Sequence, residues 1–448
     1  MNPVRLFAAV LFAALVALAP ASAPLAAEDS AALQKAVEKD YGYLKPLFEH
    51  FHRNPELSYL EHDTAKRLAA ELRKAGAEVT EGVGGTGVVG VMKNGEGPTV
   101  LIRADMDGLP VEEKSGLPYA SEATQKNLKG ETVPVAHACG HDVHMTVLVG
   151  TARRLAALKD KWRGTVVLIG QPAEERIGGA RRMLADGLYE RFPRPDFALA
   201  MHVFSLAEAG KIILKPGLAY SSSDSVDIRV HGVGSHGASP HKGKDPVMIA
   251  AHLVVALQTL VAREIPPLEP GVVTVGAIHG GTKHNIIGEA VDLQLTVRSN
   301  NQEVRDQLID GIKRISEGVG RTFGLPEDKL PTVKVSEESV PPTYNDPELT
   351  ARIREAFIRD LGEDSLIDYK REGMGAEDFG LFTTTDPPVP GAYFNVGGTP
   401  KKALEADKAG GPAVAAHHSP YFKVAPEPSI TAGVEAMTVA ALELLEKP

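Results

Sequence analysis

The sequence predicts an α/β protein: a mixed sheet is covered by helices, and a second, smaller α/β unit is inserted into the first. Apolar strand-like stretches alternate with amphipathic helical stretches from about residue 30, which is typical of layered α/β proteins. Three of these strands are followed or ended by acidic or histidine residues. A Gly- and Ser-rich stretch, residues 215–224, separates the two units.

The composition is that of an ordinary globular chain. It has 448 residues, of which 43% are hydrophobic and 24% charged, enough to bury a large core. At about 150 residues per domain we expect three domains, or two of which one is discontinuous. The formal net charge is −10, which disfavours nucleic acid as a partner. A single cysteine excludes an internal disulfide.

The first 27 residues have the features of a secretory signal peptide. Arg5 precedes an apolar run over residues 6–18, and small residues follow before Glu28. The run is too short to span a bilayer together with its flanks, and an uncleaved anchor helix is the alternative. We expect cleavage between Ala23 and Glu28 and a secreted or periplasmic protein without membrane contact. No other segment is expected to be long and apolar enough to cross a membrane.

The first domain is predicted over residues 28–220. Its elements are an amphipathic helix from Thr64 to the stop at Gly76, a hairpin over residues 87–107, a helix over 142–159, a strand over 165–172, a helix over 178–187 and a strand over 197–203. Ligands of open α/β sheets collect at the carboxyl ends of strands. The residues at or just beyond these ends are Asp105 and Asp107, Glu174 and Glu175, and His202.

The inserted unit is predicted over residues 221–338. It has a strand at 226–232, a helix at 245–263, strands at 272–279 and 290–298, a helix at 302–323 and a strand at 332–335. This βαββαβ order is that of a ferredoxin-like sandwich. Residues 339–448, with a helix at 347–362 and a histidine pair at 417–418, are expected to complete the first domain.

The densest group of potential metal ligands is the segment HACGHDVHM, residues 137–145. Cys139 and His141 lie two apart in a loop, and His144 falls in the first turn of the next helix. Thiolate and imidazole together suit zinc and other first-row divalent metals. The alternative is a small buried cysteine beside histidines that begin a helix.

Glu174 and Glu175 lie side by side just beyond a strand. Adjacent carboxylates point in different directions, so one can bind metal while the other acts as a general base. The alternatives are a solvated acidic turn here, a core histidine at His202, and a surface loop at His417 and His418. To exclude a metal site, all of these alternatives would have to hold at once on one edge of one domain. A metal site explains the four groups together and is therefore favoured.

Nine motifs then resemble one family. They are HRNPELSYLE, IRADMDGLPVEE, HACGHDVHM, GQPAEE, MHV, GVGSHGASPH, HNIIGEAVDLQLTVRS, GAEDF and HHSPYF, in order from His52 to Phe422. Together they resemble the aminoacylase/carboxypeptidase superfamily of two-metal amidohydrolases, in the branch of hippurate hydrolases, N-acyl-amino-acid amidohydrolases and plant auxin-conjugate hydrolases. The resemblance implies a discontinuous catalytic domain over residues 28–220 and 339–448, with a lid and dimerisation domain between.

The resemblance also assigns roles to residues. It implies two divalent metal ions, zinc, manganese, cobalt or nickel, with Glu174 as general base and Asp107 orienting a ligand. His236 resembles a histidine that reaches the partner subunit's site, while Asn285 and Arg298 resemble groups that hold the substrate's amide and carboxylate. Asp105 stands where the wider superfamily has a histidine ligand, so its role is open, as is the choice between His417 and His418. The implied metal ligands are Cys139, His141, Glu175, His202 and His418.

These roles imply hydrolysis of N-acyl amino acids such as hippurate-like conjugates. Metal-activated water attacks the amide, Glu174 takes and returns the proton, and His236 steadies the oxyanion. The implied assembly is a homodimer through the inserted domain. A dipeptidase or carboxypeptidase of the same fold and an inactive periplasmic binding relative are the alternatives.

Overall fold

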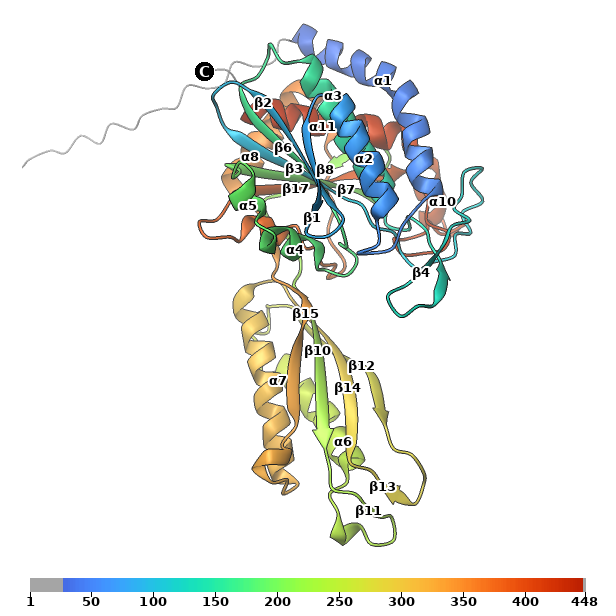
Figure 1. Cartoon of the computed structure of the whole chain (residues 1–448), viewed down its shortest axis with the longest axis vertical. Helices are drawn as coiled ribbons and strands as arrows, with labels where there is room; N and C mark the ends of the chain where they lie inside the picture. Colours follow the sequence, from blue (N-terminus) through green and yellow to red (C-terminus); the bar gives the residue numbers. More distant parts are fainter. Residues whose placement is uncertain (1–26, 446–448) are drawn as a thin grey trace, which may run out of the picture.

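The computed structural model describes residues 27–445. Figure 1 shows a large helix-covered sheet from which a slender second unit projects, as the fold class predicted. We call them the large and the small domain. The predicted signal segment, residues 1–27, lies outside the described residues except for Ala27, which begins helix α1.

The large domain is built on a seven-stranded mixed sheet with the order β1-β2-β6-β3-β7-β17-β8. The four central strands, β6, β3, β7 and β17, are parallel, so their carboxyl ends meet at one edge. In chain order the strands are β1 (Glu78–Val83), β2 (Gly87–Asn94), β3 (Thr99–Asp105), β6 (Gly164–Gln171), β7 (Phe197–Glu208), β8 (Ile212–Ile213) and β17 (Gly391–Thr399).

The prediction of a hairpin over residues 87–107 is wrong. Both of its strands form, as β2 and β3, but β6 lies between them, antiparallel to β2 and parallel to β3. The reason is the apolar character of β6 on both faces, where Val166 and Leu168 alternate with Val167 and Ile169 and all four are buried. A strand of this kind must be covered on both faces, which favours a central position.

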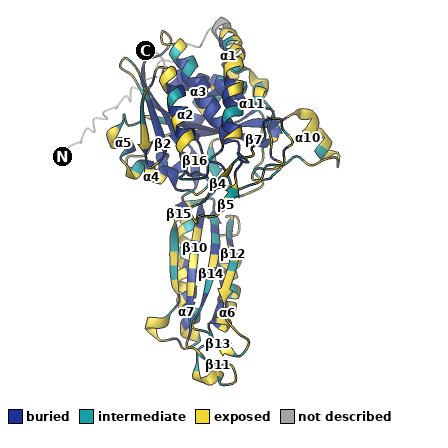
Figure 2. Cartoon of the chain, turned by 45° about the vertical axis from the view of Figure 1, so that its right-hand side comes forward, coloured by how far each residue is buried: buried dark blue, intermediate teal, exposed yellow. Residues whose placement is uncertain are grey.

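Helices cover both faces of this sheet, and Figure 2 shows the buried core between them in dark blue. One face packs against α1 (Ala27–Arg53), α2 (His62–Lys74), α3 (His141–Ala157), α8 (Pro347–Leu361) and α11 (Pro426–Leu444). The other packs against α4 (Gly179–Ala185), α5 (Leu188–Arg191) and α9 (Gly380–Thr383). The remaining elements are α10 (Lys401–Lys408), the hairpin β4 (Thr124–Lys126) and β5 (Thr132–Pro134), and the pair β9 (Gly217–Tyr220) and β16 (Thr343–Asn345).

The small domain has the predicted βαββαβ order. Its elements are β10 (Ser223–His231), α6 (Pro246–Thr259), β12 (Gly271–Gly280), β14 (Ala290–Ser299), α7 (Gln302–Thr322) and β15 (Thr332–Val340), and the sheet order is β12-β14-β10-β15. Val226, Ile228 and Val230 of β10 belong to the core that this sheet shares with α6 and α7, while Asp227 and Arg229 between them are exposed. The short strands β11 (Ser235–His236) and β13 (Ile286–Ile287) pair at the far tip (Figure 1).

One expectation about membrane segments is also wrong. Helix α6 continues into the π-helix η2 (Leu260–Glu264), and the resulting 19-residue segment has a mean hydropathy of 1.6, so by length and composition it could cross a membrane. Ile249, Leu253 and Leu257 are buried against the sheet, which explains part of this apolar character. Only 33% of the segment is buried, so much of the rest is exposed.

Candidate metal centre

The histidines, acids and cysteine singled out from the sequence gather at the carboxyl edge of the large sheet. Asp105 ends β3, the Glu174–Glu175 pair follows β6, His202 lies within β7, and Cys139 immediately precedes the N-terminal region of α3. The loop before α11 supplies the histidine pair. A cavity of about 510 Å³ opens there, lined among others by Cys139, Glu174, Glu175, His202, Arg298, His417 and His418.

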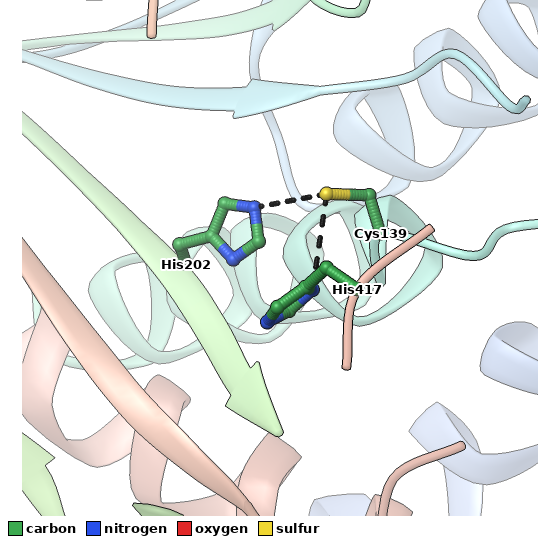
Figure 3. Close-up of side chains that lie close together, drawn as sticks. All are labelled: Cys139, His202 and His417. Carbon is green, nitrogen blue, oxygen red and sulfur yellow. Dashed lines mark hydrogen bonds between the residues drawn. The ribbon is translucent and has the colours of Figure 1, made fainter. Parts of the chain in front are cut away.

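Cys139 and His202 lie side by side on the cavity wall. The Sγ atom lies 3.4 Å from Nε2 of His202 and 3.9 Å from Nδ1 of His417 (Figure 3). Nδ1 of His202 lies 2.6 Å from the carbonyl oxygen of Val203, to which it donates. In a neutral ring the other nitrogen then carries the lone pair. The geometry therefore presents His202 Nε2 and the thiol as adjacent metal donors.

His141 is fully buried among carboxylates. Its Nε2 lies 3.7 Å from Asp105 Oδ2, 3.8 Å from Glu174 Oε2 and 3.9 Å from Glu175 Oε1, while Nδ1 lies 3.3 Å from Asp107 Oδ1. Within residues 27–445 neither ring nitrogen, nor Glu175 Oε1, has a hydrogen-bond partner. Buried polar atoms without partners are costly. A divalent cation among these donors would satisfy them, so the donor set fits a metal.

Both histidines of the 417–418 pair reach the centre. His418 Nε2 lies 3.4 Å from Glu175 Oε2, and the residue has a left-handed φ of 65°. Its backbone N–H donates to the carbonyl of Ala138, 2.8 Å away, which ties this loop to the cysteine loop. His417 Nε2 accepts a bond of 3.3 Å from the backbone N–H of Ser205. The two rings therefore approach the centre from the same loop with different hydrogen-bonding arrangements.

The centre concentrates negative charge in a buried place. Burial raises the pKa of Glu174 well above its ordinary value, and repulsion from Glu377 and Glu175 adds to the rise. Burial likewise raises the pKa of Glu175 to about 7 and that of the Cys139 thiol. Burial alone would lower the pKa of His141, yet neighbouring carboxylates raise it to about 10. Bound cations would offset this crowding and favour the ionised acids and thiolate.

Asp107 holds the Glu174–Glu175 loop in place. Its two carboxylate oxygens accept the backbone N–H groups of Glu174 and Glu175, each at 3.1 Å, and Oδ2 also accepts the hydroxyl of Ser58 at 2.6 Å. The loop has positive φ at two non-glycine residues, Ala173 (49°) and Ile177 (52°). Such backbone is held only by its surroundings, and Asp107 provides part of that support.

The groups that support Asp105 were not predicted from the sequence. Fully buried Arg103 donates to Asp105 Oδ2 at 2.6 Å and to Glu377 Oε1 at 2.7 Å. The other oxygen, Oδ1, lies 2.5 Å from Nδ1 of His144, whose Nε2 accepts the backbone N–H of Val203. Both Asp105 oxygens are thus engaged, and His144 is a support rather than a free donor. An arginine inside the apolar strand IRAD was the one signal of this arrangement.

The predicted substrate residues are divided between two places. Arg298 lines the cavity, where its only hydrogen bonds within residues 27–445 go to Thr296 Oγ1 at 3.2 Å and the carbonyl of Met374 at 3.4 Å. His236 and Asn285 lie at the small-domain tip, where His236 pairs with Ile286 across β11 and β13. Within one chain the structure does not bring these two residues to the centre.

Comparison with known proteins agrees with this geometry. Residues 101–443 match the sequence model of peptidase family M20/M25/M40. The chain is 37% identical to thermostable carboxypeptidase 2 of Saccharolobus solfataricus, covering 82% of this chain and 88% of that one, and 37% identical to hippurate hydrolase of Campylobacter jejuni, covering 76% and 85%.

A solved structure of similar fold is the YXEP protein of Bacillus subtilis, described as a dinuclear metal binding peptidase from the M20 family. It has 27% identity and a TM-score of 0.72 over 92% of this chain and 99% of that chain. The present chain has a mostly buried set of thiol, imidazole and carboxylate donors at one sheet edge. The chain therefore belongs to peptidase family M20/M25/M40, and it is a metal-dependent hydrolase that acts on amide bonds.

Proposed function

We propose that the protein cleaves the amide bond of N-acyl amino acids, such as hippurate-like conjugates. The observation that carries the proposal is the position of Glu174 and Arg298 on one cavity with the buried donor set. A general base, a metal site and a cation for a free carboxylate thereby border the same space. This arrangement suits a small substrate with one amide bond and one carboxylate.

In the proposal Cys139, His141, Glu175, His202 and His418 would hold two divalent ions. Support comes from the atoms of His141 and Glu175 that have no hydrogen-bond partner among the described residues, and from His202 Nε2, whose lone pair faces the Cys139 thiol. The donor types accept zinc, manganese, cobalt or nickel. When bound, the ions would lower the pKa of water and polarise the amide carbonyl.

Glu174 is the proposed general base. Its backbone is fixed by Asp107, and its carboxylate borders the cavity beside the donor set. From there it takes the proton of the attacking water and returns it to the leaving amine. Asp107 also lies against Nδ1 of His141, so it orients the base and a metal ligand together.

Arg298 is the proposed anchor of the substrate's carboxylate. Its guanidinium has no carboxylate partner within the described part of the chain, so it is available for a bidentate contact. The same anchor would serve a dipeptidase or carboxypeptidase, the second candidate, which the similarity to a thermostable carboxypeptidase favours. A non-catalytic binding relative is the third candidate, and the intact Glu174 argues against it.

We further propose a homodimer formed through the small domain. Helix α6 exposes Val247 (50%), Met248 (49%) and Val255 (72%), and β12 is an edge strand with an unpaired side. An exposed apolar face beside an open edge is suited to burial against a second copy. In such a dimer His236 and Asn285 would act at the partner subunit's centre, where His236 would steady the oxyanion.

The N-terminal segment supports a secreted or periplasmic location for the mature protein. An apolar stretch of this length after a basic residue and before small residues is typical of a cleaved signal. Detection of a mature N-terminus between residues 23 and 28 in the extracytoplasmic fraction would test this location.

The decisive experiment measures hydrolysis of N-acetyl amino acids, N-benzoyl amino acids and dipeptides, before and after chelation and with added zinc or manganese. Glu174→Gln should retain both metals but lose about 10²- to 10⁴-fold in turnover, whereas the matched Glu175→Gln should also lose metal. A Glu174→Gln protein with both metals and normal activity contradicts the assignment. Faster cleavage of dipeptides favours the second candidate, and no cleavage with any metal favours the third.

A further inference from the structure

A second cavity adjoins the metal centre. It has a volume of about 130 Å³, and Phe204 and Tyr220 line both this cavity and the central one. Tyr369 forms part of its wall, with its ring edge-on to Phe204 at 4.8 Å between centroids. Its further lining includes Leu218, Lys215 and Arg371. We call it the Arg371 cavity.

Arg371 is a half-buried cation without a counter-ion among residues 27–445. Its Nη2 donates to Asn300 Oδ1 at 2.9 Å and Nη1 to the carbonyl of Ala219 at 3.4 Å, and both acceptors are neutral. No carboxylate of residues 27–445 forms an ion pair with it, and burial lowers the pKa of Arg371. Lys215, also on the wall, donates to the carbonyl of Tyr369 and lies 3.5 Å from the exposed Asp368. Arg371 thus gives the cavity a positive charge that no described carboxylate pairs, whereas Lys215 is paired with Asp368.

The two unpaired arginines are neighbours in space. Arg298 contacts the carbonyl of Met374, and Arg371 contacts the side chain of Asn300, so both tie residues 298–300 to residues 371–374. Arg298 faces the central cavity and Arg371 the adjoining one. In an amino acid the side chain branches from the carbon that bears the carboxylate. A substrate anchored at Arg298 therefore has its side chain close to the Arg371 cavity.

We propose that the Arg371 cavity is the subsite for an acidic side chain, so that aspartate and glutamate conjugates are preferred among N-acyl amino acids. This inference depends on the proposed function. Arg371 would receive the side-chain carboxylate in a charge-assisted contact. Phe204 and Tyr369 would pack against the methylene groups. The cavity volume suits one short side chain and leaves no room for a long peptide.

The test compares near-isosteric substrates. The values of kcat/KM are measured for N-acetylglutamate against N-acetylglutamine and for N-acetylaspartate against N-acetylasparagine, with metal-loaded enzyme. The acidic member of each pair should be preferred at least about tenfold. Arg371→Ala should reduce this preference by a similar factor, while Lys370→Ala, which removes an exposed charge from the same loop, should not alter it. Arg298→Ala should instead weaken all four substrates.

Equal values within each pair, or an unchanged preference in Arg371→Ala, would overturn the subsite. Binding of the same four conjugates to Glu174→Gln by calorimetry gives a readout that does not require turnover. If no conjugate is cleaved, the proposed function fails. The ratio of dissociation constants, with and without Arg371→Ala in the Glu174→Gln background, still decides whether the cavity selects acidic side chains.

Discussion

Hydrogen bonds from the backbone distinguish the two adjacent histidines of the centre. Nε2 of His417 already accepts the N–H of Ser205, so a neutral ring carries its proton on Nδ1 and directs it toward Cys139 Sγ. Such a ring donates to the thiolate and has no free lone pair for a metal. Nε2 of His418 lies beside Glu175 instead. This difference favours His418 as the ligand.

We therefore expect His418→Ala to bind one metal ion fewer per chain, and His417→Gln to retain the wild-type metal content. The glutamine amide can still donate toward the thiolate. The check is the metal-to-protein ratio after dialysis against zinc, with a folded circular dichroism spectrum for both variants. Loss of an ion from His417→Gln but not from His418→Ala would reverse the assignment.

At the scale of elements, helix α11 is mostly buried, and it carries a carboxyl group, that of Glu435, for which this burial is unfavourable. Glu435 is partly buried on α11, and Glu38 of α1 lies close enough to repel it. Burial first, and then Glu38, raise the pKa of Glu435 from 4.5 to about 7. A carboxyl whose pKa is higher in the folded than in the unfolded chain takes up protons on folding. This group therefore reduces stability as the pH rises from about 4.5 to 7.

Glu435→Gln should raise the free energy of unfolding by about 1–2 kcal/mol at pH 8, after allowing for partial solvent screening. At pH 4 the gain should be close to zero, because the carboxyl is then mostly protonated in both the folded and the unfolded chain. Urea unfolding of variant and wild type at the two pH values measures the difference. The exposed Glu427→Gln, in the first turn of the same helix, is the control, and a gain independent of pH would contradict the explanation.

At the scale of the whole molecule, the separation of His236 and Asn285 from the centre has to be reconciled with their proposed roles. His236 lies on β11 and Asn285 directly precedes β13, and Figure 1 shows these two strands at the far tip of the small domain, away from the large sheet. A second copy joined through α6 and β12 would provide a route to a partner's centre. Activity would then depend on assembly, whereas metal binding would depend on one chain.

Val255→Asp should therefore weaken the dimer and lower activity while leaving the metal content unchanged. A carboxylate buried without a partner costs about 3 kcal/mol or more, which is over a hundredfold in the dissociation constant. Light scattering and activity are measured over the same concentration range, with Ile358→Asp on the exposed side of α8 as control. A fully active monomer would exclude the role of the partner's tip.

The sequence by itself determined the βαββαβ order of the small domain and the short motifs that contain the candidate metal donors. The predicted strand at 226–232 forms as part of β10, in which buried Val226, Ile228 and Val230 alternate with polar residues. Such patterns depend on neighbours along the chain, which is why they could be recognised without coordinates. The family resemblance rested on motifs of the same local kind and is confirmed.

Only the tertiary structure decided which strand lies between β2 and β3, how Asp105 is supported, and where Arg371 points. These features join residues far apart in the chain: Arg103 and Glu377 are 274 positions apart. A local sequence pattern does not predict such a contact. The contact forms because both faces of β6 are buried and because the buried charges have to be paired with one another. Local preferences therefore set the elements, and the requirement to cover apolar faces and pair buried charges set their arrangement.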